Sequence, residues 1–328
     1  MSTANEDAIS ELFTRPSIGS SAGLANRENL EWAEARIGAV ARKFLPRDRV
    51  DKILVPVDFS PGSKLALIRA STIARLYGAS MWLLHVIDPS IYLGMAWYGM
   101  AGLAPGSLAD INADSETELE VIAQEIRGQG VDCTCVVREG SLDVQIRQVI
   151  SDCGIDLLVL ATHAGTGLHG YALGATAERI LRKTVVPVVT VSICRPLREW
   201  STAGPSHVLY ATDLSDVSFR SLAYACSVRS RFSAKLTVIH VLPRGARTDT
   251  LRSAVDRLQE LALVDTDIQV LFGAVGPAVC SAAVKFGADL LAVGIERHNA
   301  LGEFLFGHTL LEILSAAPCP VLTIRQWK

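Results

Sequence analysis

The sequence predicts an α/β protein made of two tandem, doubly wound domains, each built on a five-stranded parallel sheet. Two observations carry this prediction. Apolar, strand-like runs rich in Val, Ile and Leu alternate with segments of helical spacing, and the whole alternation occurs twice in the 328 residues. Because the strand-like runs are almost continuously apolar, we expect parallel strands that helices cover on both faces.

Each predicted element of the first copy follows from local residue chemistry. Residues 62–78 have helical apolar spacing and end at a glycine, which is typical of a helix C-terminus. The other predicted helices are at 115–129, 142–153 and 175–183, and the predicted strands at 53–57, 79–87, 133–137, 156–162 and 186–191. Together they give five strand–helix steps, which the second copy repeats from 207 to 325.

The internal repeat keeps a constant register over long stretches. KILVPVDFS resembles HVLYATDLS, and this match places Asp58 over Asp213 and His85 over His240, each pair 155 residues apart. GIDLLVLATH resembles GADLLAVGIE, and this match places Gly174 over Gly307, 133 residues apart. The second copy is therefore shorter, and the segment that it lacks corresponds to an apolar insertion at 89–115.

These landmarks predict the domain organisation. Residues 1–50 form an N-terminal extension, 51–195 the first domain with its insertion, 196–206 a linker and 207–328 the second domain. The start of the extension is polar and is predicted to be mobile, whereas 26–45 carries an apolar stripe at helical spacing. This apolar stripe could pack against the rest of the chain, which is the interpretation that we favour, or it could dock on a partner or a membrane. The aromatic and methionine-rich residues of 90–105 fit a partner surface or a pocket lid, and equally burial within the chain.

Composition excludes several classes of function. The net charge of −3 gives no basic field for nucleic acid, and no apolar run is long enough to span a membrane. Asn5, Glu6 and Asp7 stand where a secretory signal would be basic. Seven scattered cysteines, among them Cys133 and Cys135, suggest ordinary packing in a reducing cytoplasm.

The candidate site lies where two predicted strands end. Asp58 ends the first strand, and the glycine-rich stretch GTGLHG at 165–170 follows the fourth. If these strands are neighbours, both elements face one crevice, which is where such folds bind ligands. GTGLHG matches G-x-G-x-x-G, but a dinucleotide fingerprint follows the first strand and needs an acidic residue about 20 positions later, which is lacking. We therefore expect turn chemistry or anion binding there, and no dinucleotide site.

Taken together, these features resemble the universal stress protein family, in a tandem two-domain form. The resemblance rests on ILVPVDFS, LLHVIDP, VVREGS, DLLVLATHAGTGL and LGATAERILRKTVVPVV, with weaker echoes in the second half. It implies the strand order 3-2-1-4-5 and a pairing of the two last strands that makes the chain an internal pseudo-dimer, able to dimerise further. For members that bind ATP, it also implies a loop of the form G-x-x-G-x9-G-[ST] around the phosphates.

Carried over residue by residue, the resemblance implies one site in each domain. In the first domain the positions are Asp58, Val86, Ala161, Ala164, Gly174 and Ala175, with Gly165 and Thr176 beside them. In the second they are Asp213, Val241, Gly294, Arg297, Gly307 and His308. Alanine in place of glycine is expected to cost about 1 kcal/mol at a left-handed position and to occupy phosphate space. Arg297 fits three roles: filling the phosphate site, pairing with an anion there, or pairing at the surface.

Three functions follow from this interpretation. The first is a non-catalytic stress-response protein that binds ATP or another adenine nucleotide. The second is a scaffold with degenerate pockets that acts through protein partners, and the third is a slow ATP hydrolase or phosphotransfer enzyme. His85 and His240 are predicted to be structural, because no nucleophile with an orienting carboxylate accompanies them. No metal site is expected from His163, His169, His298 and His308.

Overall fold

The structure is a computed structural model, and it describes residues 50–90, 108–162, 164–165, 172–173, 175–193, 200–201, 203–214, 216–247, 249–250, 267–295 and 308–325. The N-terminal stripe and the aromatic part of the insertion, on which the partner predictions rest, lie outside these residues. The body that contains both repeats is one compact unit, Phe44–Lys328. Among the described helices, none has the length and apolar character to cross a membrane.

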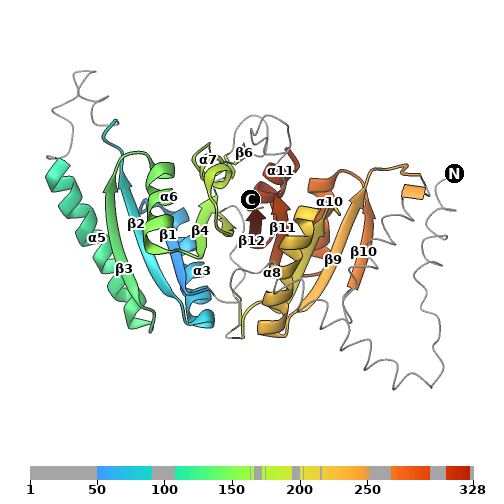
Figure 1. Cartoon of the computed structure of the whole chain (residues 1–328), viewed down its shortest axis with the longest axis horizontal. Helices are drawn as coiled ribbons and strands as arrows, with labels where there is room; N and C mark the ends of the chain where they lie inside the picture. Colours follow the sequence, from blue (N-terminus) through green and yellow to red (C-terminus); the bar gives the residue numbers. More distant parts are fainter. Residues whose placement is uncertain are drawn as a thin grey trace. The chain divides into compact units, whose positions relative to one another are not determined.

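The first half alternates strands and helices as predicted (Figure 1). Its elements are β1 (Lys52–Pro56), α3 (Pro61–Tyr77), β2 (Ser80–Ile87), α5 (Leu108–Gly128), β3 (Cys133–Glu139), α6 (Leu142–Cys153), β4 (Leu157–Thr162), β5 (Ala164–Gly165), β6 (Ala172–Leu173), α7 (Ala175–Lys183) and β7 (Val188–Ser192). The helix α5 begins earlier than the predicted 115. Pro105, Gly106 and Ser107 immediately precede it, and this sequence is a helix-start signal that periodicity alone overlooks.

The second half repeats the pattern. Its elements are β8 (His207–Thr212), α8 (Asp216–Phe232), β9 (Lys235–Leu242), β10 (Asp267–Phe272), α10 (Val275–Lys285), β11 (Leu290–Ile295), α11 (His308–Ala316) and β12 (Val321–Arg325). In each half the first long helix starts directly after the first strand, as the register of the repeat predicts.

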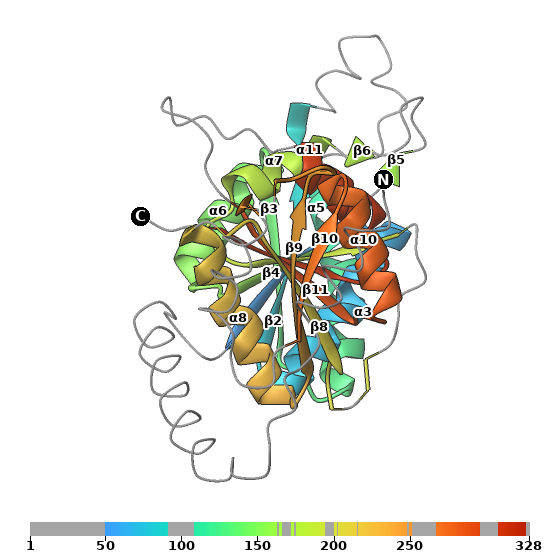
Figure 2. The ribbon, with the colours of Figure 1, turned by 90° about the vertical axis from the view of Figure 1, so that its right-hand side faces the viewer.

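The strands of both halves form one ten-stranded sheet in the order β10-β9-β8-β11-β12-β7-β4-β1-β2-β3. Each half therefore has the order 3-2-1-4-5 among its own strands, and pairing within each half is parallel. Figure 2 shows the strands rotating progressively along the sheet, which is the ordinary twist of parallel strands.

The two halves join through an antiparallel seam between β7 and β12. Leu322 pairs with Val189, and Thr190 donates a side-chain hydrogen bond to the Val321 carbonyl at 3.3 Å. Pro187 and Pro320 stand just before these strands, where a missing amide does not interrupt the ladder. The seam makes the chain an internal pseudo-dimer, as the resemblance implies.

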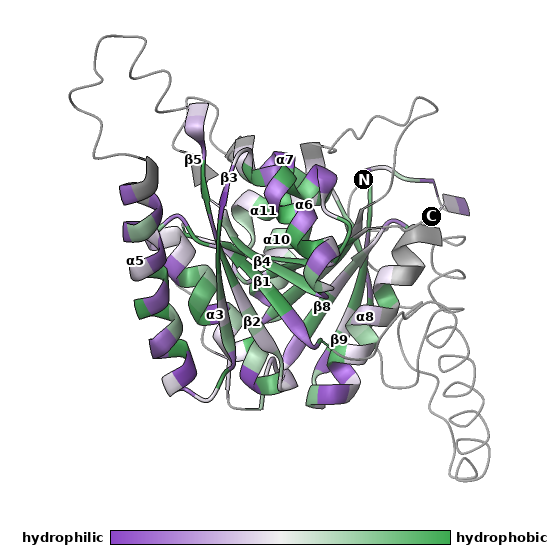
Figure 3. Cartoon of the chain, turned by 60° about the vertical axis from the view of Figure 1, so that its left-hand side comes forward, coloured by the Kyte–Doolittle hydropathy of each residue, from purple (hydrophilic) through white to green (hydrophobic). Residues whose placement is uncertain are grey.

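Helices cover both faces of the sheet. Ile53 and Val55 of β1 belong to a core cluster that includes residues of α3, α5 and α8, whereas Leu54 belongs to a second cluster with residues of α6, α7, α10 and α11. Figure 3 shows hydrophobic strands at the centre and hydrophilic residues along α5. Alternate strand residues thus face opposite cores, which explains the unbroken apolar runs.

The two cysteine side chains of β3 pack in the protein interior, as predicted. Cys133 is buried, and the Cys135 thiol lies 3.5 Å from the Leu119 carbonyl oxygen in α5. Burial raises the pKa of Cys133 to about 12 and that of Cys135 to about 11. Because the thiolate is the reactive species, both side chains act as core residues at neutral pH.

Candidate functional site

A cavity of about 440 Å³ opens at the carboxyl ends of β1 and β4. These strands are neighbours, with Ile53 paired to Leu157, so the strand order reverses between them. This is the position at which doubly wound sheets bind ligands. The cavity is lined by Pro56, Val57, Asp58, Ser60, Ser63, His85, Val86, Leu142, Leu160, Ala161, Thr176, Ala177 and Ile180.

Asp58 is held by the turn that leads into α3. Its Oδ1 accepts a hydrogen bond from the Ser60 amide at 3.0 Å, and Phe59 between them has a φ of 59°. Ser60 in turn caps α3, because its Oγ accepts from the Ser63 amide at 3.2 Å. Burial alone would raise the pKa of Asp58, but hydrogen bonds from Ser60 and Ser63 outweigh this effect and lower the pKa. Asp58 therefore presents an ionised, exposed carboxylate at neutral pH.

The two repeated histidines are structural. The carbonyl of Val57 only accepts, so the His85 Nδ1 that lies 2.7 Å from it carries the proton. His240 makes the same contact with the Thr212 carbonyl at 2.8 Å. The His85 ring also stacks on Phe59, with the ring centroids 4.7 Å apart. These contacts confirm the predicted hydrogen-bonded role of both histidines, which tie the second strand of each half to the end of the first.

The alanine that replaces a glycine at position 161 causes no backbone strain. Ala161 pairs regularly with Val191, and among the described residues the positive φ angles outside glycine belong to Phe59, Leu214 and Ser233. The expected left-handed penalty is therefore wrong for Ala161, because a regular strand conformation continues through this position. Its methyl group instead narrows the cavity that it lines.

Two short strands flank the glycine-rich stretch. Ala164 and Gly165 form β5 and pair antiparallel with Leu173 and Ala172 of β6. Gly174 lies outside the described residues. Ala175 begins α7, and Thr176 in its first turn does line the cavity.

The helix α7 is anchored to α6 by a buried carboxylate. Asp143 is 3% exposed, and its Oδ2 accepts from the Lys183 ammonium at 2.6 Å while its Oδ1 lies 3.2 Å from Arg179 Nε. The Ser141 hydroxyl also donates to this carboxylate at 2.7 Å. The hydrogen bond from Lys183 is the largest cause of a lowered pKa for Asp143. This cluster fixes the helix whose start borders the cavity.

Substitution Asp143→Asn is expected to lower the free energy of unfolding at pH 7 by about 1–3 kcal/mol, because it removes charge-assisted hydrogen bonds at a buried site. An aspartate whose pKa is lower in the folded than in the unfolded protein stabilises the folded state. This stabilisation is complete above the unfolded pKa, near 3.9, and is lost as pH falls through the folded pKa. In urea titrations the difference from wild type should therefore begin to shrink below about pH 4 and disappear only once the pH is below the lowered folded pKa. Asp152→Asn, an exposed acid on the same helix, is the control. A difference that persists undiminished at low pH would contradict the charge-based explanation.

The second domain repeats part of this arrangement. Asp213 is exposed directly after β8, and Leu214 has a φ of 65°, close to that of Phe59. Gly294 lies on β11, which neighbours β8, and Val241 lies on the adjacent β9. Arg297 and Gly307 lie outside the described residues. His308 begins α11.

Sequence reasoning missed part of the cavity wall. Ser60, Ser63, Leu142 and Ile180 line the cavity but were not singled out. Ser60 followed by Pro61 is a recognisable helix start, so the two serines could have been found. Leu142 and Ile180 carry no such signal, because only tertiary packing brings α6 and α7 to this edge. Among the described residues, no group of three His, Cys, Asp or Glu could hold a metal ion; three of the loop histidines fall outside them.

Comparisons with known proteins agree with this architecture. The family model described as "Universal stress protein family" matches the chain twice, at residues 49–192 and 205–325. A universal stress protein of Methanocaldococcus jannaschii is 26% identical over 151 residues, which are 43% of this chain and 93% of the relative. One from Thermus aquaticus is 28% identical over 133 residues, which are 36% of this chain and 97% of the relative.

Solved structures share the fold over most of the chain. A universal stress protein from Archaeoglobus fulgidus superposes with a TM-score of 0.65 at 18% identity, covering 84% of this chain and 98% of that one. A protein from Pseudomonas aeruginosa described as a putative universal stress protein gives 0.62 at 20% identity, covering 85% of this chain and 94% of that one. With a family model that matches both halves and a sheet of the same order in each, the chain belongs to the universal stress protein family, in tandem form.

Proposed function

We propose that this chain is a non-catalytic stress-response protein that binds an adenine nucleotide in the cavity of its first domain. The observation that carries the proposal is the cavity itself, which has the Asp58 carboxylate at the end of β1 and the start of α7 at the end of β4. A volume of about 440 Å³ is within the range of small-ligand pockets, roughly 300–1,000 Å³.

The lining divides the cavity by chemistry. Val86, Leu160 and Ile180 supply apolar walls for a purine ring. The Asp58 carboxylate accepts hydrogen bonds from ribose hydroxyls or from the exocyclic amine. Phosphates lie toward the first turn of α7, where backbone amides and the Thr176 hydroxyl donate, because a helix N-terminus favours anions.

The lining also supports binding without turnover. Among the described lining residues the titratable side chains are Asp58 and His85, and His85 Nδ1 donates its proton to the Val57 carbonyl. Ser60 and Ser63 are engaged in capping α3. This arrangement offers no serine paired with a base, which is the arrangement that a covalent phosphotransfer would need.

The second domain and the domain limits belong to the same proposal. Asp213, Val241 and Gly294 would hold an equivalent base and ribose, with Arg297 meeting the phosphates beside Gly307 and His308. The domains correspond to residues 51–195 and 207–328. Nucleotide binding would change how the chain associates with a second copy of itself, or with a protein partner bound at 26–45 or 90–105.

Calorimetry on nucleotide-stripped protein tests the first-domain site. Wild type is expected to bind ATP saturably, and Asp58→Asn should weaken binding about 10- to 100-fold, because a hydrogen bond to a charged group contributes about 1.5–3 kcal/mol. Asp213→Asn, the same change at the repeated position, is the matched control and should leave this site unchanged. AMP in place of ATP measures what the phosphates contribute.

Two results would overturn the proposal. If no heat is seen at millimolar nucleotide, the pockets are degenerate and the chain acts as a scaffold. If ADP accumulates in the sample and its formation is lost in Asp58→Asn, the protein is a slow hydrolase.

A further inference from the structure

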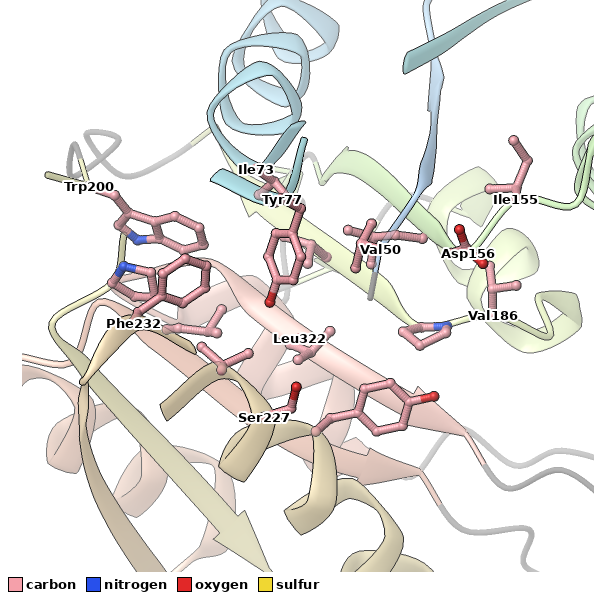
Figure 4. Close-up of a pocket in the computed structure, with 17 residues that line it drawn as sticks. Val50, Ile73, Tyr77, Ile155, Asp156, Val186, Trp200, Ser227, Phe232 and Leu322 are labelled. Atoms are coloured by element: carbon pink, nitrogen blue, oxygen red, sulfur yellow. The ribbon is translucent and has the colours of Figure 1, made fainter. Parts of the chain in front are cut away.

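A second pocket, of about 220 Å³, lies between the two halves beneath the seam. Its walls come from repeated positions: Ile73 and Tyr77 of α3 face Val228 and Phe232 of α8, and Trp200 of the inter-domain segment closes one end (Figure 4). It shares no lining residue with the nucleotide cavity.

Beside this pocket the repeat carries a charged side chain in one half only. Arg69 of α3 is 1% exposed, its guanidinium lies 4.1 Å from the centre of the Trp200 ring, and it interacts electrostatically with Asp289. The residue 155 positions later, where the repeat would place another arginine, is Tyr224, which lies near Asp156. Arg69 thus packs against Trp200, which lines the pocket, whereas Tyr224 itself forms part of the pocket wall.

Two hydroxyl groups point into this cavity. Figure 4 shows the Tyr77 hydroxyl directed toward Leu322 and Ser227, and the Ser227 hydroxyl directed toward Tyr77. Within the described part of the chain, neither hydroxyl has a hydrogen-bond partner. The Tyr77 ring is held in place, because Arg231 lies 4.5 Å over it and Phe232 packs edge-on at 5.5 Å. Both residues are only partly buried, and neither hydroxyl is among the fully buried atoms that lack a partner, so both are accessible to a polar group that enters the pocket.

The other residues that line the pocket indicate which class of ligand it can bind. Among the described residues that line the pocket there is no lysine or arginine, and the Asp156 carboxylate already accepts from the amides of Asp51 and Lys52. An anion would find no counter-charge there. A dry cavity of about 150 Å³ holds benzene, so a space of about 220 Å³ accommodates one aromatic ring with a substituent.

We propose that the pocket between the halves binds a small, uncharged aromatic molecule of the phenol class. Its ring lies among the apolar side chains of α3, α8 and the seam, and its single polar group bridges the hydroxyls of Tyr77 and Ser227. Such a ligand contacts both halves at once. Its binding is independent of the nucleotide site.

Titration of the full chain with p-cresol and with toluene tests the proposal, because the two probes share a shape and differ by one hydroxyl. Wild type should bind p-cresol saturably by calorimetry and show a higher Tm in its presence. Tyr77→Phe and Ser227→Ala should each weaken p-cresol about fivefold, as expected for one neutral hydrogen bond, and leave toluene unchanged. Thr72→Ala, at the position that the repeat aligns with Ser227, is the control, because its hydroxyl donates to the Ile68 carbonyl.

Two outcomes would overturn it. One is the absence of saturable p-cresol binding to folded wild type up to about 5 mM, well above a millimolar Kd. The other is equal p-cresol affinity in wild type and both hydroxyl variants, which would show that these groups do not recognise the ligand. Val228→Phe, which fills the pocket with an apolar ring, should abolish binding of both probes while the chain stays folded by circular dichroism.

Discussion

Asp289→Ala is expected to lower the free energy of unfolding by about 3–5 kcal/mol, the cost typical of removing one partner from a buried charged cluster. Asp289 is 7% exposed, and its Oδ2 accepts from the amides of Ser206 at 2.9 Å and His207 at 3.1 Å, and from the Ser206 hydroxyl. It also faces the buried Arg69, whose pKa burial lowers to about 10 while the Asp289 charge opposes this effect. The substitution leaves two amides without their acceptor and removes a negative charge that stabilises the buried Arg69 cation.

The repeat supplies a matched control for this prediction. Asp156 occupies the same place in the first half and accepts from the amides of Asp51 and Lys52, but Tyr224 stands where Arg69 would be. In urea titrations Asp156→Ala should therefore cost less than Asp289→Ala. Equal losses would mean that the guanidinium contributes nothing to the cost.

Val189→Asp at the seam is expected to cost more than about 4 kcal/mol, because it places an unpaired carboxylate in the core. Val189 is 4% exposed and pairs with Leu322 across the two halves. The Tm should fall sharply, and the cooperative transition should split if either half persists alone. A single transition at lower stability would mean that the halves fold only together.

Val185→Asp is the control for that substitution. Val185 lies four residues earlier, between α7 and β7, and is 40% exposed. The same chemical change there should shift the free energy of unfolding by less than about 0.5 kcal/mol. If both variants lose similar stability, burial at the seam is not the cause.

Much of the fold could be predicted from the sequence because its signals are local and occur twice. The predicted helices at 142–153 and 175–183 coincide with α6 and α7. Near-continuous apolar strands indicated a parallel sheet, and the register of the repeat aligned the two halves. The start of α5 was predicted too late, because residues 108–114 were assigned to the apolar insertion at 89–115.

The candidate site was predictable where strand ends determine it. Asp58, Val86, Ala161 and Thr176 line one cavity, because the carboxyl ends of neighbouring parallel strands meet at one edge. The β5–β6 pair was not foreseen, since two-residue strands leave no periodicity. The pocket between the halves is lined by residues of α3, α8 and the inter-domain segment, and no local sequence pattern indicates that these come together.

The seam between β7 and β12 has a consequence for how the halves evolve and assemble. Because one chain carries both partners, their association is intramolecular and does not depend on the concentration of the protein. Dilution does not separate them, as it would separate two subunits. Selection is then free to act on each half independently, so the same repeated position can hold Arg69 in one half and Tyr224 in the other, which a homodimer of identical chains could not do.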